Sequence, residues 1–485
     1  MNVQEKLRMY YGAVAVDKRL VSEEAPRSVP SYVGEWLVRR FFTGIPAEEA
    51  RRRMAAFIAK HLPMPGQREE VKAQLRRLGH YTLIDEFKVF TDLKANRYVL
   101  VIPTLDISDA YIDDELVDQH EMLLSGSVWG AGRLLYEPDS LSEQGPMRLR
   151  MDRFEPIQMS SFDFELFAER RERFTVEEWR EVLIHSQGLN PDAYPLEPQR
   201  RILMARLMPI VQKNLNIFEL APKGTGKTYI YKNLSTYTHV ISGGAVTPAA
   251  LFYNLSMRKM PGLLALNDVV VFDEVQSIQF DNPREVGGIL KDYMESGSYH
   301  RGVKKVSADA SLGFLGNIEM SENGLPKHQR WFDALPYPLN ESALIHRIHA
   351  FLPGWHLPKI DVADKALTRE LGLAADYLSE ALHRLRNQDG HEQHIVRRVK
   401  VRGTQDIRDE KAVQRVATAL FKLLFPHGKA TDDELMFYCV EPAIEYRQYV
   451  RDQLTLRDEE FPPFILSADL REAPDTFIPS SSSVS

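Results

Sequence analysis

The sequence predicts an α/β protein in which a parallel sheet with a helical lid follows an α+β N-terminal domain containing a β-barrel-like module. Residues 199–350 alternate helical stretches with short apolar strands, the pattern of a parallel sheet joined by crossover helices. Residues 360–450 show helical spacing of apolar residues, and residues 80–136 are β-rich between turns. We therefore expect five segments: a helical region (1–78), a β-rich module (79–190), an α/β core (199–355), a helical lid (356–455) and a disordered tail (456–485).

The composition excludes several classes of protein. With 44% apolar and 27% charged residues among 485, the chain is globular rather than fibrous or disordered. Its formal net charge of −7 gives no general attraction for nucleic acid, so DNA binding would need a local basic patch. The single cysteine, Cys439, excludes an internal disulfide and a cysteine-built zinc site. No secretory signal and no apolar run of about 18 residues is present, so we expect a cytoplasmic protein without membrane contact.

Three helices are predicted near the N-terminus, over residues 29–42, 46–62 and 67–78. Their basic residues and Trp36 are compatible with DNA binding: Arg39, Arg40, Arg51, Arg52, Arg53, Arg76 and Arg77. Nearby glutamates make ion-paired helix faces the slightly favoured alternative for any single arginine. Further along, Thr175 and Glu178 form a capping-box pattern at the start of a helix predicted over 175–188.

The strongest motif is NIFELAPKGTGKTYIYKNL at 216–234, where an apolar strand leads through a glycine-containing loop into a helix. Such a loop turns successive backbone N–H groups toward one anion, and the helix N-terminus adds its dipole. Lys227 should reach the β- and γ-phosphates of ATP, and the Thr228 hydroxyl should bind Mg²⁺. Ala221 replaces the first glycine of the usual pattern, which is a small departure. The predicted nucleotide-binding residues are Pro222, Lys223, Gly224, Thr225, Gly226, Lys227 and Thr228.

Two further strands lead into polar residues. In NDVVVFDEV (267–275), Asp273 is predicted to hold Mg²⁺ and Glu274 to act as general base on the attacking water. In ASLGFLGNIEM (310–320), Asn317 is predicted to orient that water beside the γ-phosphate. The alternatives are solvated acids after a strand and a turn-forming asparagine.

A basic hairpin is predicted between these two strands, because the β-prone pieces SYHRG and VKKVSA flank Gly302. Its Arg301, Lys304 and Lys305 would offer positive charge to a DNA backbone, and Tyr299 would stack or hydrogen-bond there. A basic surface hairpin without DNA contact is the alternative.

These features, in this order, resemble an AAA+ ATPase over residues 200–430. Six segments are similar to the BrxL family, the Lon-related AAA+ proteins of bacterial BREX phage-defence systems: VPSYVGEWLV, ELAPKGTGKTYIYKNLS, SGGAVTPAALFYN, VVVFDEVQSI, LKDYMESGSYHRG and GFLGNI. The resemblance implies a ring-forming, ATP-hydrolysing, DNA-binding motor like that of MCM helicases. It further implies a hexamer or paired hexamers, duplex or single-stranded DNA, and other BREX proteins as partners.

The family carries a Lon-like domain after the motor, whereas residues 451–485 show no Ser–Lys protease pattern. We therefore expect a short or truncated form without peptidase activity.

The resemblance also suggests roles for two arginines. Arg347, on an amphipathic stretch after the sheet in SALIHRIHAFLPGW, is expected to reach the γ-phosphate of a neighbouring subunit. Arg408 is expected to contact nucleotide from the lid, with Arg415 as the alternative. The hairpin would line a central pore, behind a DNA collar formed by the N-terminal segments. A protein-remodelling unfoldase of a Lon-type protease, and a DNA scaffold that only binds ATP, remain as alternative functions.

Overall fold

The computed structural model describes residues 1–26, 28–64, 66–93, 95–124, 127–138, 141–142, 145–146, 149–157, 162–254, 261–360 and 365–472. They form two compact units: one contains Val16–Phe162 with Ala374–Tyr377, and the other contains Met1–Ala15, Asp163–Leu373 and the chain from Leu378 onward. In the described part of the chain, every helix is too short or too polar to span a lipid bilayer.

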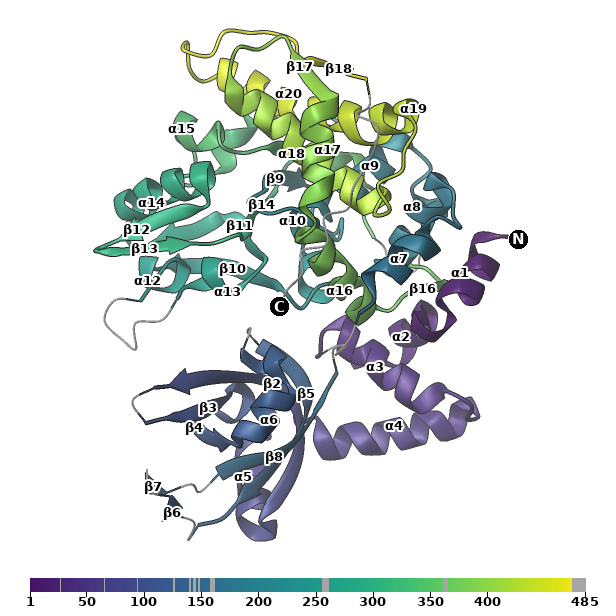
Figure 1. Cartoon of the computed structure of the whole chain (residues 1–485), viewed down its shortest axis with the longest axis vertical. Helices are drawn as coiled ribbons and strands as arrows, with labels where there is room; N and C mark the ends of the chain where they lie inside the picture. The colour runs from purple at the N-terminus through teal and green to yellow at the C-terminus, as the bar shows by residue number, and fades with distance from the viewer. Residues whose placement is uncertain are drawn as a thin grey trace. The chain divides into compact units, whose positions relative to one another are not determined.

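The smaller unit contains helices and a closed barrel (Figure 1). Its helices are α2 (Lys18–Glu24), α3 (Ser31–Phe42), α4 (Ala47–His61), α5 (Arg68–Leu78) and α6 (Asp114–Gln119). The barrel strands β2 (His80–Asp92), β3 (Arg97–Ile102), β4 (Ile107–Ile112), β8 (Leu149–Pro156) and β5 (Ser127–Tyr136) close in that order. Alternate residues of each strand face inward, and the rings of Phe87 and Phe154 meet edge to face there at 5.8 Å. The β-rich module expected from the sequence thus contains a barrel.

Several arginines predicted as DNA-binding candidates in this unit are ion-paired instead. The pairs are Arg39 with Asp376 (3.6 Å), Arg40 with Glu155 (2.7 Å), Arg51 with Glu24 (2.6 Å) and Arg53 with Glu49. The Arg40 guanidinium also lies 4.9 Å from the centre of the Trp36 ring. These contacts favour ion-paired helix faces for these four arginines.

The larger unit is built on five parallel strands in the order β10-β11-β14-β9-β15 (Figure 1). Their bounds are β9 (Asn216–Ala221), β10 (Thr238–Val246), β11 (Val269–Phe280), β14 (Ser311–Asn317) and β15 (Ala350–Pro353). The connections contain α11 (Lys227–Asn233), α12 (Pro248–Leu251), α13 (Leu263–Leu266), α14 (Pro283–Ser296), the hairpin β12 (Ser298–Arg301) and β13 (Lys304–Ser307), and α15 (Ser342–Ile345). Apolar side chains of the central strands are fully buried, and Phe272 stacks on Phe314 at 5.3 Å. The mixed α/β fold with a parallel sheet is confirmed.

Helices before and after the sheet complete this unit. Before it lie α1 (Val3–Tyr11), α7 (Phe164–Arg171), α8 (Val176–Ser186), α9 (Glu197–Ala205) and α10 (Met208–Val211). After it come α16 (Ala375–Arg386), α17 (Asp389–Arg398), α18 (Ile407–Leu424), α19 (Asp432–Leu435) and α20 (Glu441–Thr455), with α18 packed between α17 and α20. The capping box of Thr175 and Glu178 is confirmed at α8.

Three element predictions were wrong in detail. Within the region expected to be helical (360–450), Leu371–Leu373 form the strand β16 and helix α16 begins at Ala375. The stretch around Arg347 was expected to come after the last strand of the sheet. It precedes β15, which is the edge strand of the sheet. Within the segment expected to be disordered, Ser467–Leu470 form β18, which pairs with β17 (Val399–Arg402). Such pairings join residues far apart in the chain, so local patterns do not reveal them.

Candidate functional site

The loop between β9 and α11 has the conformation that its glycines allow. Gly224 and Gly226 have φ values of 85° and 73°, in the left-handed region that favours glycine. Ala221 is the last residue of the buried strand β9, so its backbone is extended and accepts any residue. The alanine in place of the usual first glycine therefore costs the loop nothing.

The segment after β15 lies against this loop. The backbone N–H of Ile360 donates to the Gly224 carbonyl at 2.8 Å, and a Cβ added at Gly226 would come within 2.8 Å of Ile360 Cδ1. The positive φ of Gly226 favours glycine there, whereas the contact with Ile360 involves only the end of a flexible side chain that can shift.

The polar residues predicted from three separate motifs meet at the carboxyl edge of the sheet. Lys227 Nζ donates to Asn317 Oδ1 at 2.8 Å, and the Thr228 hydroxyl donates to Asp273 Oδ1 at 2.9 Å. They meet because β14 lies between β9 and β11, so its last residue falls between the loop and the acidic residues. Burial lowers the pKa of Lys227, while Glu219 and Asp273 oppose that shift.

Asp273 and Glu274 are adjacent in sequence but differ in their surroundings. Asp273 is buried and also accepts the backbone N–H of Glu274 at 3.0 Å. Glu274 is exposed and has a φ of 50°, which is uncommon for a residue with a side chain. The strand β11 continues beyond it to Phe280, with a register shift in its pairing to β10. The carboxylates therefore directly follow the last residue of β11 that pairs with β14, although the strand itself continues to Phe280.

The oxygens of Thr228 and Asp273 fit a Mg²⁺ ion. Magnesium prefers hard oxygen ligands and is usually held in proteins by one or two carboxylates, with water and phosphate completing its shell. A hydroxyl and a carboxylate already 2.9 Å apart, beside a phosphate-binding loop, match this requirement.

Gln276 contributes to the site, although sequence patterns did not single it out. Its Nε2 donates to the backbone carbonyl of Asn317 at 2.6 Å, and its Oε1 accepts the Asn317 N–H at 3.3 Å. Both backbone groups of Asn317 are thereby fixed. A glutamine three residues after Asp273 carries no sequence signal of its own, since the contact crosses from one strand to another.

A buried ion pair beneath the loop was also missed. Arg206 and Glu219 are both fully buried, with Nη2 and Oε1 2.6 Å apart. Arg206 Nη1 also donates to the Thr225 carbonyl at 3.0 Å, which fixes the phosphate-binding loop from below.

Replacing Arg206 with Met is expected to destabilise the larger unit by about 3–5 kcal/mol, because Glu219 would remain buried without a partner. Nucleotide affinity should fall as well, since the Thr225 carbonyl loses its donor. Thermal unfolding and nucleotide titration measure the two effects. The double variant R206M/E219L should regain most of the stability but not the affinity. Arg173→Met, which breaks an exposed pair with Glu169, should shift the melting temperature far less. Equal shifts for R206M and R173M would contradict the prediction.

The two arginines predicted to contact nucleotide lie together, at the opposite edge of the sheet from the loop. Arg347 precedes the start of β15, which runs parallel to β9, whereas the loop follows the end of β9. These two edges lie at opposite ends of β9, whose six residues span about 20 Å. Arg347 and Arg408 both approach Glu295 Oε2 of α14, at 3.1 Å and 2.9 Å. Arg408 thus lies away from the loop of its own chain, and its predicted contact with nucleotide from the lid stays a prediction.

Buried charges fix the backbone around Arg347. Arg447 is fully buried, pairs with Asp409 at 2.7 Å, and donates to the carbonyls of His346 and Ile348 on either side of Arg347.

Arg415, the alternative to Arg408, donates to the Asn214 carbonyl at 3.0 Å and is largely buried. Arg415 is thus structural here. His346, Asp406 and Asp409 lie close enough to hold a cation, but Arg447 and Arg451 already supply the positive charge.

The predicted hairpin is present as β12 and β13, and Figure 1 shows it projecting beside α14. Its side chains differ in burial, although Arg301 lies opposite Lys304 and therefore shares a face with it. Tyr299 is buried with its hydroxyl donating to the Phe252 carbonyl at 2.7 Å, and Arg301 bonds to the Tyr253 carbonyl and pairs with Glu285. Lys304 and Lys305 are exposed. The role predicted for Tyr299 as a surface contact does not agree with its burial.

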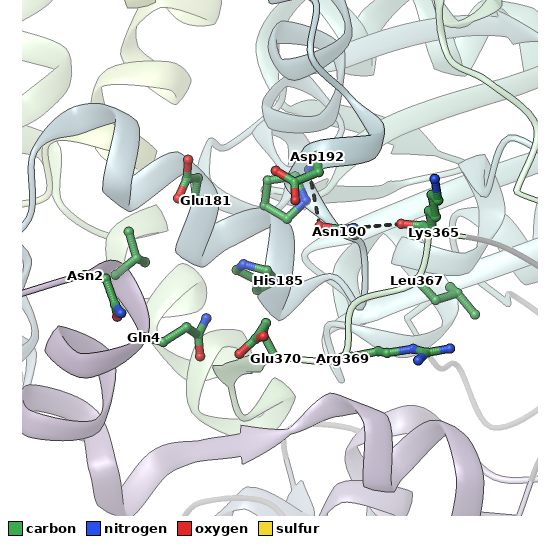
Figure 2. A pocket seen from close by; sticks show the side chains of 12 residues that line it. Asn2, Gln4, Glu181, His185, Asn190, Asp192, Lys365, Leu367, Arg369 and Glu370 are labelled. Atoms are coloured by element: carbon green, nitrogen blue, oxygen red, sulfur yellow. Dashed lines mark hydrogen bonds between the residues drawn. The ribbon is translucent and has the colours of Figure 1, made fainter.

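A cavity of about 640 Å³ lies elsewhere in the larger unit. Figure 2 shows it lined by His185 and Glu181 from α8, by Gln4 from α1 and by the segment around Arg369. His185 Nδ1 lies 2.7 Å from the Thr368 hydroxyl, and burial lowers its pKa to about 4. The described lining includes none of the residues predicted from the motifs.

A parallel sheet with a loop that matches the phosphate-binding pattern, an acidic strand beside it and a helical region after it are features of the ATPase class of nucleotide-binding proteins. The family model for the ATPase domain of the Lon-like protease BrxL matches residues 149–467, and the model for the N-terminal part of the BREX system Lon protease-like protein BrxL matches residues 9–136. The chain belongs to the BrxL family. The family resemblance seen in the sequence is thereby confirmed.

Two relatives show how far the similarity extends. The Lon-like protease BrxL of Bacillus cereus (strain H3081.97) is 33% identical over 458 residues, which cover 93% of this chain and 66% of the relative. The Lon-like protease BrxL of Escherichia coli O9:H4 (strain HS) is 32% identical over 452 residues, covering 92% of this chain and 64% of the relative. The chain thus spans slightly less than two thirds of the length of these relatives.

Proposed function

We propose that this chain is a ring-forming AAA+ ATPase that binds DNA within a BREX phage-defence system. The observation that carries the proposal is the division of the site between two edges of one sheet. Lys227, Thr228, Asp273 and Asn317 lie at the carboxyl edge, while Arg347 lies at the amino edge. Because one chain cannot bring both edges to one nucleotide, a complete site needs a second copy. A closed ring satisfies this requirement for every copy.

In the proposed mechanism, the loop from Pro222 to Gly226 cradles the phosphates with its backbone N–H groups and Lys227 binds their oxygens. A Mg²⁺ ion held by Thr228 and Asp273 would neutralise phosphate charge during transfer. Glu274 accepts the proton of the attacking water, whose position Asn317 fixes. Gln276 holds Asn317 in place through both of its backbone groups. Arg347 of a neighbouring copy stabilises the charge that develops on the γ-phosphoryl group.

The proposal of DNA as the partner rests on the exposed lysines of the hairpin. Lys304 and Lys305 lie next to the two-residue turn that joins β12 to β13, so both charges are presented near its tip. In a ring these charges would repeat once per subunit. They would attract the phosphate backbone without selecting a base sequence.

Reversing both charges, as in K304E/K305E, is expected to weaken DNA binding at least tenfold and to reduce its dependence on salt, because phosphate contacts release counterions. ATP hydrolysis without DNA should not change. Binding to labelled duplex and single-stranded DNA over a range of salt concentrations measures the effect. The variant K400E/K411E reverses two exposed lysines elsewhere and serves as the control. Equal DNA affinity in the two variants would refute the assignment of DNA to the hairpin.

A protein-remodelling motor is the second candidate, and one feature favours it. Val303 at the hairpin tip is fully exposed, and an apolar tip suits a polypeptide substrate better than a phosphate backbone. Stimulation of ATP hydrolysis distinguishes the two candidates. We expect stimulation by DNA; stimulation by casein alone would favour protein remodelling.

A further inference from the structure

Three separate elements bring charged side chains to one point at the amino edge of the sheet. Arg347 comes from the turn before β15, Arg408 from the first turn of α18 and Glu295 from the last turn of α14. Both Nε atoms lie near the same carboxylate oxygen, Oε2 of Glu295. We call these three residues the arginine clamp.

The position of Glu295 in its helix and its exposure to water both weaken its contacts in the clamp. A carboxylate in the last turn of a helix is disfavoured by the helix dipole, and the Glu295 side chain is still 39% exposed to water. Arg347 Nε is buried and lies 3.1 Å from Glu295 Oε2, but the two atoms do not form a hydrogen bond. The contact therefore leaves a buried donor of Arg347 with hydrogen-bonding capacity for another anion.

The arginines are positioned largely independently of Glu295. Arg347 Nη1 donates to the Ala343 carbonyl at 2.6 Å, and Arg447 binds the carbonyls on both sides of Arg347. The same Arg447 pairs with Asp409, the residue that follows Arg408. The buried pair thus connects the backbone of the two arginines, so they can keep their relative placement if Glu295 leaves.

Two guanidinium groups that converge on one anionic oxygen form an arrangement suited to a phosphate group. We propose that Glu295 is an internal substitute for phosphate, which holds Arg347 and Arg408 in the separate subunit until the γ-phosphate of ATP on a second copy replaces it. This inference rests on the proposed function. It assigns both arginines to the nucleotide of the neighbour and makes Glu295 a competitor of that nucleotide. ADP has no γ-phosphate and would displace Glu295 less effectively, so assembly would depend on ATP.

The isosteric change Glu295→Gln tests the proposal in the full chain. E295Q lacks the competing charge, so it should assemble at a lower protein concentration when a non-hydrolysable ATP analogue is present. The concentration for half-maximal assembly should fall roughly threefold to tenfold, which is the range expected for the loss of two partly exposed ion pairs. Assembly in ADP should rise relative to the wild type. Sedimentation velocity measures assembly, and ATPase rates at increasing protein concentration measure its effect on turnover.

Asp292→Asn is the matched control, because Asp292 is exposed three residues earlier on the same helix. It should change assembly much less than E295Q. Suppose that wild-type turnover rises with protein concentration but that E295Q assembles at the same concentration as the wild type. That result would overturn this inference and leave the proposed function standing. A fall in the E295Q turnover rate to that of R347A would also overturn it, because Glu295 would then be orienting Arg347. A wild-type rate per subunit that does not depend on protein concentration would overturn the proposed function as well.

Discussion

Glu274→Gln is expected to bind ATP and assemble normally but to lose turnover by about 10²–10⁴-fold, the usual contribution of a general base. The amide keeps the size of the side chain and its exposed position after Asp273, but it cannot accept a proton. The contacts of Lys227 with Asn317 and of Thr228 with Asp273 do not involve Glu274, so nucleotide binding should remain. Lys227→Ala should instead lose nucleotide binding itself.

Steady-state ATP hydrolysis and binding of a fluorescent ATP analogue separate these two effects. Glu322→Gln, an exposed acid in the loop after β14, provides a control for the loss of one negative charge. Turnover in E274Q within a factor of two of the wild type would refute the role of Glu274. Loss of nucleotide binding in E274Q would show that Glu274 belongs to the binding machinery.

Arg347→Ala is expected to lower turnover by about 10³–10⁵-fold, the contribution typical of an arginine that stabilises charge in phosphoryl transfer. The loss should be rescued in trans. A mixture of R347A with K227A contains subunits with an intact loop and subunits with an intact arginine, so neighbouring pairs can form complete sites. Neither variant alone provides both.

ATPase rates across a series of mixing ratios measure this rescue. Arg347→Lys keeps the charge but loses the planar fork, so its rate should stay close to that of R347A. A mixture no more active than its two components, with assembly shown by sedimentation, would contradict action between subunits.

Local patterns were sufficient for the backbone conformation of the loop between β9 and α11. Glycines at positive φ, a lysine and a threonine at the start of a helix, and an apolar strand before them are constraints within about 20 residues. The same holds for the capping box at Thr175 and for the hairpin around Gly302. In each case the interaction that shapes the element lies between near neighbours in the chain.

Long-range contacts account for what the patterns missed. Tyr299 was expected to stack or hydrogen-bond to DNA from the hairpin, but its ring packs against Phe252 and Tyr293. Gln276 and Arg206 act through Asn317 and Thr225, which lie on other strands and loops. Arg408 was predicted to contact nucleotide from the lid, and the fold places it beside Arg347 and Glu295.

The sequence by itself determined the class of this protein, its BrxL family and the glycine turn between β9 and α11, because each depends on residue type at short spacing. Only the tertiary structure decided which of these residues share a site. The strand order places Asn317 between Lys227 and Asp273, and it places Arg347 at the other edge of the sheet. Strand order is set by pairing between segments 31 (269 − 238) to 133 (350 − 217) residues apart, which explains why no local pattern contains it.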